Sequence, residues 1–371
     1  MIRKKILDEI SPYVPGKPIE EVKRELGLKE VIKLASNENG MRPSRRVIKA
    51  ITEAAGDVNR YPDGGCFRLK KAVSGKFSVS PDNIVFGNGS DEIIFLALRA
   101  FLDPGDEVVI AEPTFLVYRS ASLIEGAKVR TVPLKNFKYD LEAMAKAVTP
   151  KTKIVFIANP DNPTGTYVND RALEAFIGKI PEDTLVFLDE AYYEFAKGGD
   201  YPESLPLIKR KDVNVIITRT FSKAYSLAGL RIGYAFARKD IADALNKVRE
   251  PFNVNSLAQA AALAALEDEK YLRDSLRLVE KEKKRFYEVF DKLDVTYIPS
   301  RTNFVLVDTG RPSQKVFEYM LRRGVIIREM TAWGLKQCIR VNIGLRDEND
   351  VFFKVFTDVM REIPRATRDE G

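Results

Sequence analysis

Residues 213–223 read VNVIITRTFSK, an apolar run that ends in a Thr-Phe-Ser-Lys segment. The run Val213–Thr218 is short and rich in β-branched residues, which predicts a buried strand. Open α/β sheets bind ligands at the carboxyl ends of their strands, so Lys223 follows its strand where a ligand is expected. A single lysine after a strand is more often a surface residue, and on this stretch alone that interpretation stays open.

Short apolar runs alternate with amphipathic segments from about Asp82 to Ala237. This pattern predicts an α/β fold with a mainly parallel seven-stranded sheet and crossover helices in one large domain. The expected strands are 84–86, 107–111, 128–132, 154–158, 185–188, 213–218 and 233–237.

The pattern changes after Pro251 to long helices and then to shorter strands, which predicts a smaller α+β domain at the C-terminus. The expected elements there are helices at 255–266 and 270–293 and strands at 304–307 and 339–343. The first forty residues are rich in proline and charge, with little periodicity. We therefore expect an N-terminal arm (1–40) that joins the small domain or a partner subunit, a large domain (41–255) and a small C-terminal domain (256–371).

The composition excludes several classes of protein. The 371 residues include no histidine, which rules out a Ser-His-Asp triad and argues against a zinc enzyme, so no metal is expected. The two cysteines are too few for a disulfide framework. The net charge of +7 could suggest a nucleic-acid partner. Basic and acidic residues alternate, however, as in EKEKKR at residues 280–285, which predicts a solvated helix face and no nucleic-acid partner.

No apolar run approaches the roughly 20 residues that a membrane span requires. The N-terminal residues 1–8 also lack the apolar core of a signal peptide. We therefore expect a cytoplasmic protein without a membrane partner.

Arg231 lies eight residues after Lys223, in the otherwise apolar stretch AGLRIGY at residues 228–234. A cation in such surroundings needs an anion. Burial and a nearby positive charge both lower the pKa of a lysine, as a nucleophilic amine requires. A phosphate held by Arg231 would explain both cations.

Asp189 ends the expected strand 185–188 and is followed by EAYY at residues 190–193. A helix N-cap explains this aspartate without any function. Alternatively, its carboxylate lies opposite a pyridine nitrogen and keeps that nitrogen protonated, so that the ring accepts electrons from a substrate carbon. Tyr192 could then hydrogen-bond a ring hydroxyl.

Two loops add further candidates. NPDNPTG at residues 159–165 is explained by a plain turn, although the Asn162 amide would also reach a carboxyl strand end, where it could donate to a phenolate oxygen. GNGSDE at residues 87–92 offers free backbone N–H groups before a helix, a site suited to phosphate. The third glycine of the dinucleotide fingerprint is missing there, which argues against NAD.

Taken together, these features predict one ligand, pyridoxal 5'-phosphate. They are, in this order, a phosphate loop, an aromatic platform, an Asn, an Asp, a Lys and an Arg.

Several motifs resemble the fold type I pyridoxal-phosphate-dependent aminotransferases, and most closely the histidinol-phosphate aminotransferase family. NPTG (162–165), DEAY (189–192) and Ser222-Lys223 with Arg231 carry the first resemblance. The closer one rests on PYVPG (12–16), ASNEN (35–39), YPDG (61–64), GSDE (89–92), RTFSKAY (219–225), PFNVN (251–255) and RVNIG (340–344). It spans nearly the whole chain.

The resemblance implies a role for each cofactor residue. Lys223 would form the Schiff base and move the proton, Asp189 would pair with the pyridine nitrogen, and Phe115 would stack on the ring. Asn162 and Tyr192 would contact the ring oxygen. The phosphate would be held by the backbone of Ser90 and Asp91, by Thr220, Ser222 and Arg231, and by Tyr61 of a neighbouring subunit, which implies a homodimer.

The resemblance also implies a phosphorylated amine and a 2-oxo acid as substrates. Arg340 would bind the phosphate of histidinol phosphate, assisted by Arg328, Tyr13 and Asn37; a surface ion pair is the alternative for Arg328. The run GMRP at 40–43 departs from the Pro-Leu-Gly-Pro that the family more often shows, which puts the local turn in doubt. An aromatic aminotransferase, a phosphothreonine-type decarboxylase and a non-catalytic regulator on the same fold remain alternatives.

Overall fold

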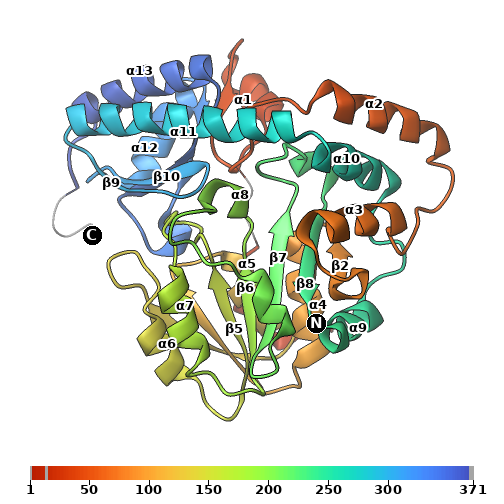
Figure 1. Ribbon diagram of the computed structural model, residues 1–371. Helices are drawn as coiled ribbons and strands as arrows, with labels where there is room; N and C mark the ends of the chain where they lie inside the picture. Colours follow the sequence, from red (N-terminus) through yellow and green to blue (C-terminus); the bar gives the residue numbers. More distant parts are fainter. Residues whose placement is uncertain (1, 13–15, 367–371) are drawn as a thin grey trace. The chain divides into compact units, whose positions relative to one another are not determined.

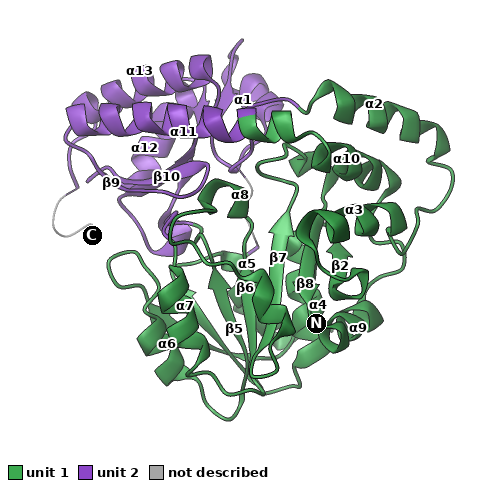
Figure 2. Cartoon of the chain, viewed as in Figure 1, with its two compact units in different colours: residues 1–11, 43–162, 167–273 green, residues 12–42, 163–166, 274–371 purple. Residues whose placement is uncertain are grey.

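The computed structural model describes residues 2–12 and 16–366, and the chain divides into two compact units (Figure 2). Unit 1 comprises Met1–Ser11, Pro43–Asn162 and Tyr167–Arg273, and unit 2 comprises Pro12–Arg42, Pro163–Thr166 and Asp274–Gly371. The three domain ranges expected from the sequence stay predictions.

Unit 1 is built on a seven-stranded sheet with the order β2-β8-β7-β6-β5-β3-β4 (Figure 1). The strands are β2 (Ile84–Gly87), β3 (Glu107–Glu112), β4 (Lys128–Pro133), β5 (Thr152–Ala158), β6 (Leu185–Asp189), β7 (Asn214–Thr220) and β8 (Gly233–Ala237). Strand β8 is antiparallel to β2 and β7, and the other neighbours are parallel. The predicted mainly parallel sheet of seven strands is therefore confirmed.

Burial explains why these runs form strands. The residues of β6 and β8 are buried throughout, as are nearly all those of β5 and β7, which suits central strands covered on both faces. The edge strand β4 instead exposes Lys128, Arg130 and Thr131 in part or in full. Charged and polar side chains on an edge strand discourage pairing with another chain.

Helices of unit 1 follow the strands and several begin at a capping side chain. The oxygens of Ser44, Asp140, Asn169 and Asn255 accept backbone N–H groups at the starts of α2, α6, α7 and α10. The helices are α2 (Arg45–Ala54), α3 (Phe67–Phe77), α4 (Ser90–Phe101), α5 (Leu116–Ile124), α6 (Leu141–Ala147), α7 (Asp170–Ile177), α8 (Tyr193–Ala196), α9 (Lys239–Val248) and α10 (Ser256–Leu266). Helix α4 packs into the apolar core beside the sheet, which orients its N-terminus at the end of β2.

Unit 2 contains a four-stranded antiparallel sheet with the order β12-β13-β10-β9 and a parallel pair, β1 with β11. The strands are β1 (Ile32–Lys33), β9 (Thr296–Ile298), β10 (Phe304–Asp308), β11 (Val325–Ile326), β12 (Arg328–Glu329) and β13 (Cys338–Asn342). Its helices are α1 (Ile19–Leu26), α12 (Ser313–Arg322), α13 (Arg346–Glu362) and most of α11 (Glu269–Lys292). The predicted smaller α+β part is confirmed.

Helix α1 was not predicted from the sequence. Val22 is its one buried residue, and it packs with Ala35 and Ile326. The helix ends at Gly27, whose φ of 66° is a left-handed conformation suited to glycine. Its apolar residues Ile19, Val22 and Leu26 lie at the i, i+3 and i+7 positions of a helix face, so the sequence contained a helical signal that the prediction overlooked.

Within the described part of the chain, no helix is long and apolar enough to cross a membrane.

Candidate active site

Three polar segments meet at one edge of the unit 1 sheet. In the parallel strands β5, β6 and β7, Ala158 lies beside Asp189, and Asp189 lies beside Thr218. Backbone bonds continue this order beyond the strands, because Asn159 N–H donates to the Asp189 carbonyl at 2.8 Å. The segments that carry Asn162, Asp189 and Lys223 therefore all leave the sheet at its carboxyl edge, as the sequence predicted.

Asp189 is buried and receives three hydrogen bonds. Its carboxylate accepts from the Tyr118 hydroxyl at 2.7 Å, from the Ala191 N–H at 3.1 Å and from the Thr218 hydroxyl at 3.2 Å. Burial raises the pKa of Asp189 above its ordinary value, while the hydrogen bonds from Tyr118 and Thr218 oppose that rise. A cation held against this carboxylate would also keep it ionised.

A cradle for an anion forms where α4 begins. Gly89 precedes the helix with a φ of 81°, and a Cβ on it would lie 2.5 Å from Nη2 of Arg231. A Cβ on Gly233 would lie 2.5 Å from the Ser90 nitrogen. Glycine at both positions thus lets the Arg231 guanidinium and the N-terminus of α4 approach the end of the sheet.

The residues expected to bind phosphate converge on this cradle. Arg231 Nη2 lies 3.1 Å from Asp91 Oδ2, and its Nη1 lies 3.4 Å from Ser222 Oγ. Ser222 N–H in turn donates to the Thr220 hydroxyl at 3.1 Å. Three segments distant in sequence therefore bring hydroxyls, a guanidinium and a helix N-terminus to one place, a donor set that suits a phosphate.

Lys223 and the residues expected to surround a ring lie in the same unit. Lys223 is half-buried, and its Nζ lies 5.9 Å from the ring centroid of the buried Tyr192. Phe115, just before α5, makes an edge contact with Tyr118 at 5.5 Å between ring centroids. Tyr118 also donates to Asp189. The ring contact therefore connects Phe115, predicted to stack on the ring, to Asp189, predicted to pair with the pyridine nitrogen.

Two features next to the site segments were not predicted from the sequence, namely Tyr118 and a buried ion pair. Tyr118 lies three residues after Phe115 on α5, a helical spacing that could have identified it. Arg219 and Glu190 form a salt bridge of 2.8 Å, with both side chains at most 1% exposed. The Arg219 guanidinium also lies 3.3 Å from the ring centroid of Tyr193. Each partner directly adjoins a site segment, since Glu190 follows Asp189 and Arg219 precedes Thr220.

Glu194 is a second buried carboxyl near Arg219. Burial raises the pKa of Glu194 to about 7. The unfolded chain therefore loses this proton near pH 4.5, whereas the folded chain keeps it until near pH 7. The folded state is destabilised as pH rises through this window, by an amount that reaches its full value above pH 7.

We expect Glu194→Gln to remove this pH-dependent penalty. The variant should be more stable than the wild type at pH 8, by at most roughly 3 kcal/mol, and little changed at pH 4.5. Urea unfolding at both pH values measures the difference, with exposed Glu182→Gln as the matched control. A stability gain that is equal at both pH values would contradict a titrating Glu194.

The two arginines expected to bind substrate lie directly opposite each other in unit 2. Arg328 of β12 and Arg340 of β13 are Cα partners across antiparallel strands. Their guanidinium carbons lie 5.1 Å and 5.8 Å, respectively, from the Trp333 ring centroid, and Arg340 is only 4% exposed. Like charges in directly opposed positions repel, so this arrangement favours a bound anion.

The remaining predicted residues are placed as follows. Asn37 is buried in unit 2, where its backbone N–H donates to the Asn342 side chain and its carbonyl accepts from Asn303. Tyr61 of unit 1 is 82% exposed and stacks on Phe252 at 4.7 Å between centroids. Tyr13 lies outside the described residues.

The donor set of unit 1 fits pyridoxal phosphate. The cradle around Gly89 offers backbone N–H groups and Arg231 to a doubly charged phosphate. Buried Asp189 matches a ring nitrogen that must stay protonated, and the Lys223 amine lies beyond the end of the next strand. The roles of the individual residues stay predictions.

The family model of class I and II aminotransferases matches residues 29–354. The match covers most of the chain, which therefore belongs to the class I and II aminotransferases.

Within this family, many similar proteins are histidinol-phosphate aminotransferases, as the sequence motifs predicted. The chain is 47% identical over 351 residues to the one from Moorella thermoacetica, which covers 95% of this chain and 91% of that protein. It is 48% identical over 353 residues to histidinol-phosphate aminotransferase 2 of Carboxydothermus hydrogenoformans, covering 95% and 97%. The solved structure of the Sinorhizobium meliloti histidinol-phosphate aminotransferase in complex with pyridoxal-5'-phosphate matches with a TM-score of 0.89 and 33% identity, covering 97% and 98% of the two chains.

Proposed function

We propose that this chain is a pyridoxal-phosphate-dependent aminotransferase of histidine biosynthesis. It interconverts L-histidinol phosphate and imidazole-acetol phosphate, with L-glutamate and 2-oxoglutarate as the second pair of substrates. The observation that carries this substrate choice is the opposed pair Arg328 and Arg340, because guanidinium groups bind phosphate through paired hydrogen bonds.

Pyridoxal phosphate, when bound, supplies a carbonyl that combines with amines and a protonated ring that accepts electrons. Asp189 keeps the ring nitrogen protonated, since its buried carboxylate is stabilised by a facing cation. Asn162 and Tyr192 hold the ring oxygen, and Phe115 covers one face of the ring. The Lys223 Nζ would take the proton from the substrate carbon and deliver it to the cofactor, a role that histidine cannot have in a chain without histidine.

The phosphate of the cofactor and that of the substrate use different cations in this proposal. Ser90, Asp91, Thr220, Ser222 and Arg231 hold the first within unit 1. The second is held by Arg328 and Arg340 of unit 2, assisted by Asn37 of the same unit and by Tyr13.

An aromatic aminotransferase or a phosphothreonine-type decarboxylase would use the same cofactor residues. A titration of the holoenzyme with L-histidinol phosphate, L-phenylalanine and O-phospho-L-threonine separates these candidates. We expect the visible absorbance of the bound cofactor to change at the lowest concentration with L-histidinol phosphate. Preference for another amine would overturn the substrate assignment. A chain that binds no pyridoxal phosphate would overturn the enzyme class and favour the non-catalytic regulator on the same fold.

Arg340→Ala should selectively weaken the binding of phosphorylated substrates. Removing one guanidinium from a buried charge pair costs 2–5 kcal/mol, which is at least about 30-fold in the KM for L-histidinol phosphate. The KM for L-phenylalanine should change far less if Arg340 binds the phosphate. Exposed Arg322→Ala is the matched control, and equal losses for both amines would contradict the phosphate role.

We also propose a cytoplasmic homodimer in which Tyr61 reaches the phosphate of the neighbouring site. Tyr61 and Phe252 stack at the surface of unit 1, where Tyr61 is 82% and Phe252 45% exposed in the single chain. Such an aromatic pair is typical of an interface. Sedimentation velocity of the wild-type protein tests the dimer, and a monomer would contradict it.

A further inference from the structure

Two hydroxyls and a carboxylate form a cluster in unit 1 that no assigned role explains. The Thr114 hydroxyl donates to Asp161 Oδ1 at 2.8 Å and lies 2.7 Å from the Tyr139 hydroxyl. The Tyr139 hydroxyl lies 3.2 Å from the same Asp161 oxygen and accepts from the Ala158 N–H at 3.2 Å. These contacts close a triangle of oxygen atoms.

The cluster joins the carboxyl ends of two strands. Thr114 follows β3 by two residues, and Asp161 follows β5 by three. Each is the residue immediately before a proposed ring contact, since Phe115 follows Thr114 and Asn162 follows Asp161. Tyr139 precedes α6 and bonds to both segments and to the end of β5.

Burial makes these hydrogen bonds matter. Asp161 is fully buried and Thr114 is 5% exposed. Burial raises the pKa of Tyr139 well above its ordinary value, so its hydroxyl keeps its proton and remains a donor. A buried carboxylate is expensive unless donors satisfy it, so displacing either hydroxyl should shift the Asp161 segment.

We propose that Thr114, Tyr139 and Asp161 are positioning residues that hold Phe115 and Asn162 against the cofactor ring. The inference rests on the proposed function, because it presumes that both side chains contact the cofactor ring. The cluster touches the ring only through its neighbours, and its effect is to fix the platform and the amide donor relative to each other.

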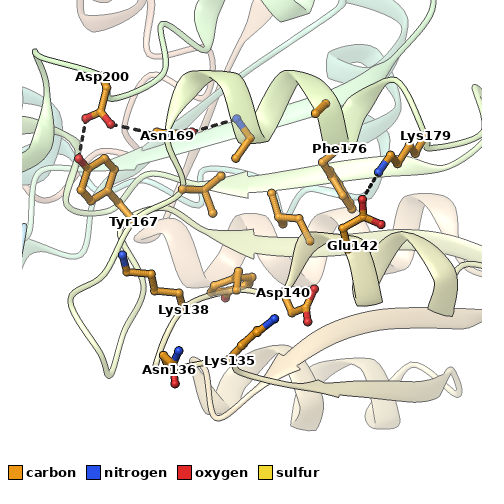
Figure 3. A pocket seen from close by; sticks show the side chains of 15 residues that line it. Lys135, Asn136, Lys138, Asp140, Glu142, Tyr167, Asn169, Phe176, Lys179 and Asp200 are labelled. Atoms are coloured by element: carbon orange, nitrogen blue, oxygen red, sulfur yellow. Dashed lines mark hydrogen bonds and ion pairs between the residues drawn. The ribbon is translucent and has the colours of Figure 1, made fainter.

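A neighbouring tyrosine provides a matched control. Tyr139 and Tyr167 both line a pocket of about 600 Å³ beside α6 and α7. Figure 3 shows the bond between the Tyr167 hydroxyl and the Asp200 side chain. The two oxygens lie 2.5 Å apart. Tyr167→Phe therefore removes a tyrosine hydroxyl bonded to a carboxylate from the same pocket without altering the cluster.

The test measures cofactor binding to the apoenzyme rather than turnover alone. We expect Tyr139→Phe and Asp161→Asn to weaken pyridoxal phosphate binding about 10-fold, the effect of one buried hydrogen bond to a charged group. Tyr167→Phe should change it less than about 2-fold. Thr114→Val should behave like Tyr139→Phe, whereas Thr114→Ser keeps the hydroxyl and should restore wild-type binding. The pH midpoint of the bound cofactor's absorbance should shift in the weakened variants and stay unchanged in Tyr167→Phe.

The outcomes separate this inference from the proposed function. If the wild-type chain binds pyridoxal phosphate and transaminates, but Tyr139→Phe and Tyr167→Phe have equal cofactor affinities and midpoints, the positioning role is wrong. If Tyr139→Phe lowers the melting temperature of the apoenzyme but leaves the cofactor affinity unchanged, the cluster only stabilises the fold, and the positioning role is also wrong. A wild-type chain that binds no cofactor would overturn the proposed function and this inference together. If Asp161→Asn fails to fold, the comparison of Thr114→Val with Thr114→Ser, together with Tyr139→Phe, still tests the positioning role.

Discussion

Lys223→Ala is expected to lower transamination by about four orders of magnitude while the fold persists. The amine is the one group proposed both to bind the cofactor covalently and to move the substrate proton, and general acid-base catalysis alone contributes up to about 10⁴-fold. Lys223 is half-buried, so truncation leaves no large cavity in the core. The measurement is the single-turnover rate with L-histidinol phosphate, which isolates the chemical step from product release.

Two controls make this result specific to the amine. Lys211→Ala removes an exposed lysine of the same unit and should leave the rate unchanged. Small primary amines added to Lys223→Ala should recover part of the rate, because they can occupy the vacated space and accept the same proton. Full activity in Lys223→Ala would refute the assignment, and a loss without any amine rescue would indicate a structural role instead.

The large sheet could be predicted because its strands are buried on both faces. Runs such as Ile154–Ala158 and Leu185–Leu188 are continuously apolar, and the structure contains both within β5 and β6. The direction of β8 was not encoded in the same way. Its residues fit a central strand of either direction, and the path of the chain between β7 and β8 makes β8 antiparallel to both neighbours.

Candidate site residues could be predicted where a polar side chain ended an apolar run. Asp189 ends β6, Asn162 and Lys223 follow β5 and β7 by four and three residues, and the parallel register brings the three segments to one edge. Tyr118 and Tyr139 gave no such signal, because each depends on partners distant in sequence. Arg219 directly follows the predicted strand 213–218, but its role depends on its pairing with Glu190, which the sequence does not show.

The opposition of Arg328 and Arg340 shows the same limit in unit 2. Strand β12 has only two residues, too few for a period to be read. The pairing depends on the register with β13, which turns and tertiary packing determine. Both arginines could be identified from the sequence as candidate substrate ligands, but their opposition across the two strands could not be predicted.

Asp189→Asn should cause the second large loss, about 100- to 1,000-fold in kcat. The substitution keeps the volume of the side chain but removes the buried negative charge that stabilises a protonated ring nitrogen. Loss of one partner from a buried charge pair typically costs 3–5 kcal/mol, and part of that cost falls on the reaction barrier. KM for the amine should change little, because Asp189 is not among the proposed substrate contacts.

The hydrogen bonds around Asp189 allow a graded test of this argument. Tyr118→Phe removes the 2.7 Å donor and keeps the charge, so its loss in kcat should be only about 5-fold. Exposed Asp183→Asn is the matched control and should behave as the wild type. The pH profile of kcat adds a readout that packing alone would not move, since burial raises the pKa of Asp189 and Tyr118→Phe removes a bond that lowers it. If Asp189→Asn and Tyr118→Phe lose equal activity with unchanged pH profiles, the hydrogen-bond network rather than the charge supports the ring, and the proposed pairing with the pyridine nitrogen is wrong.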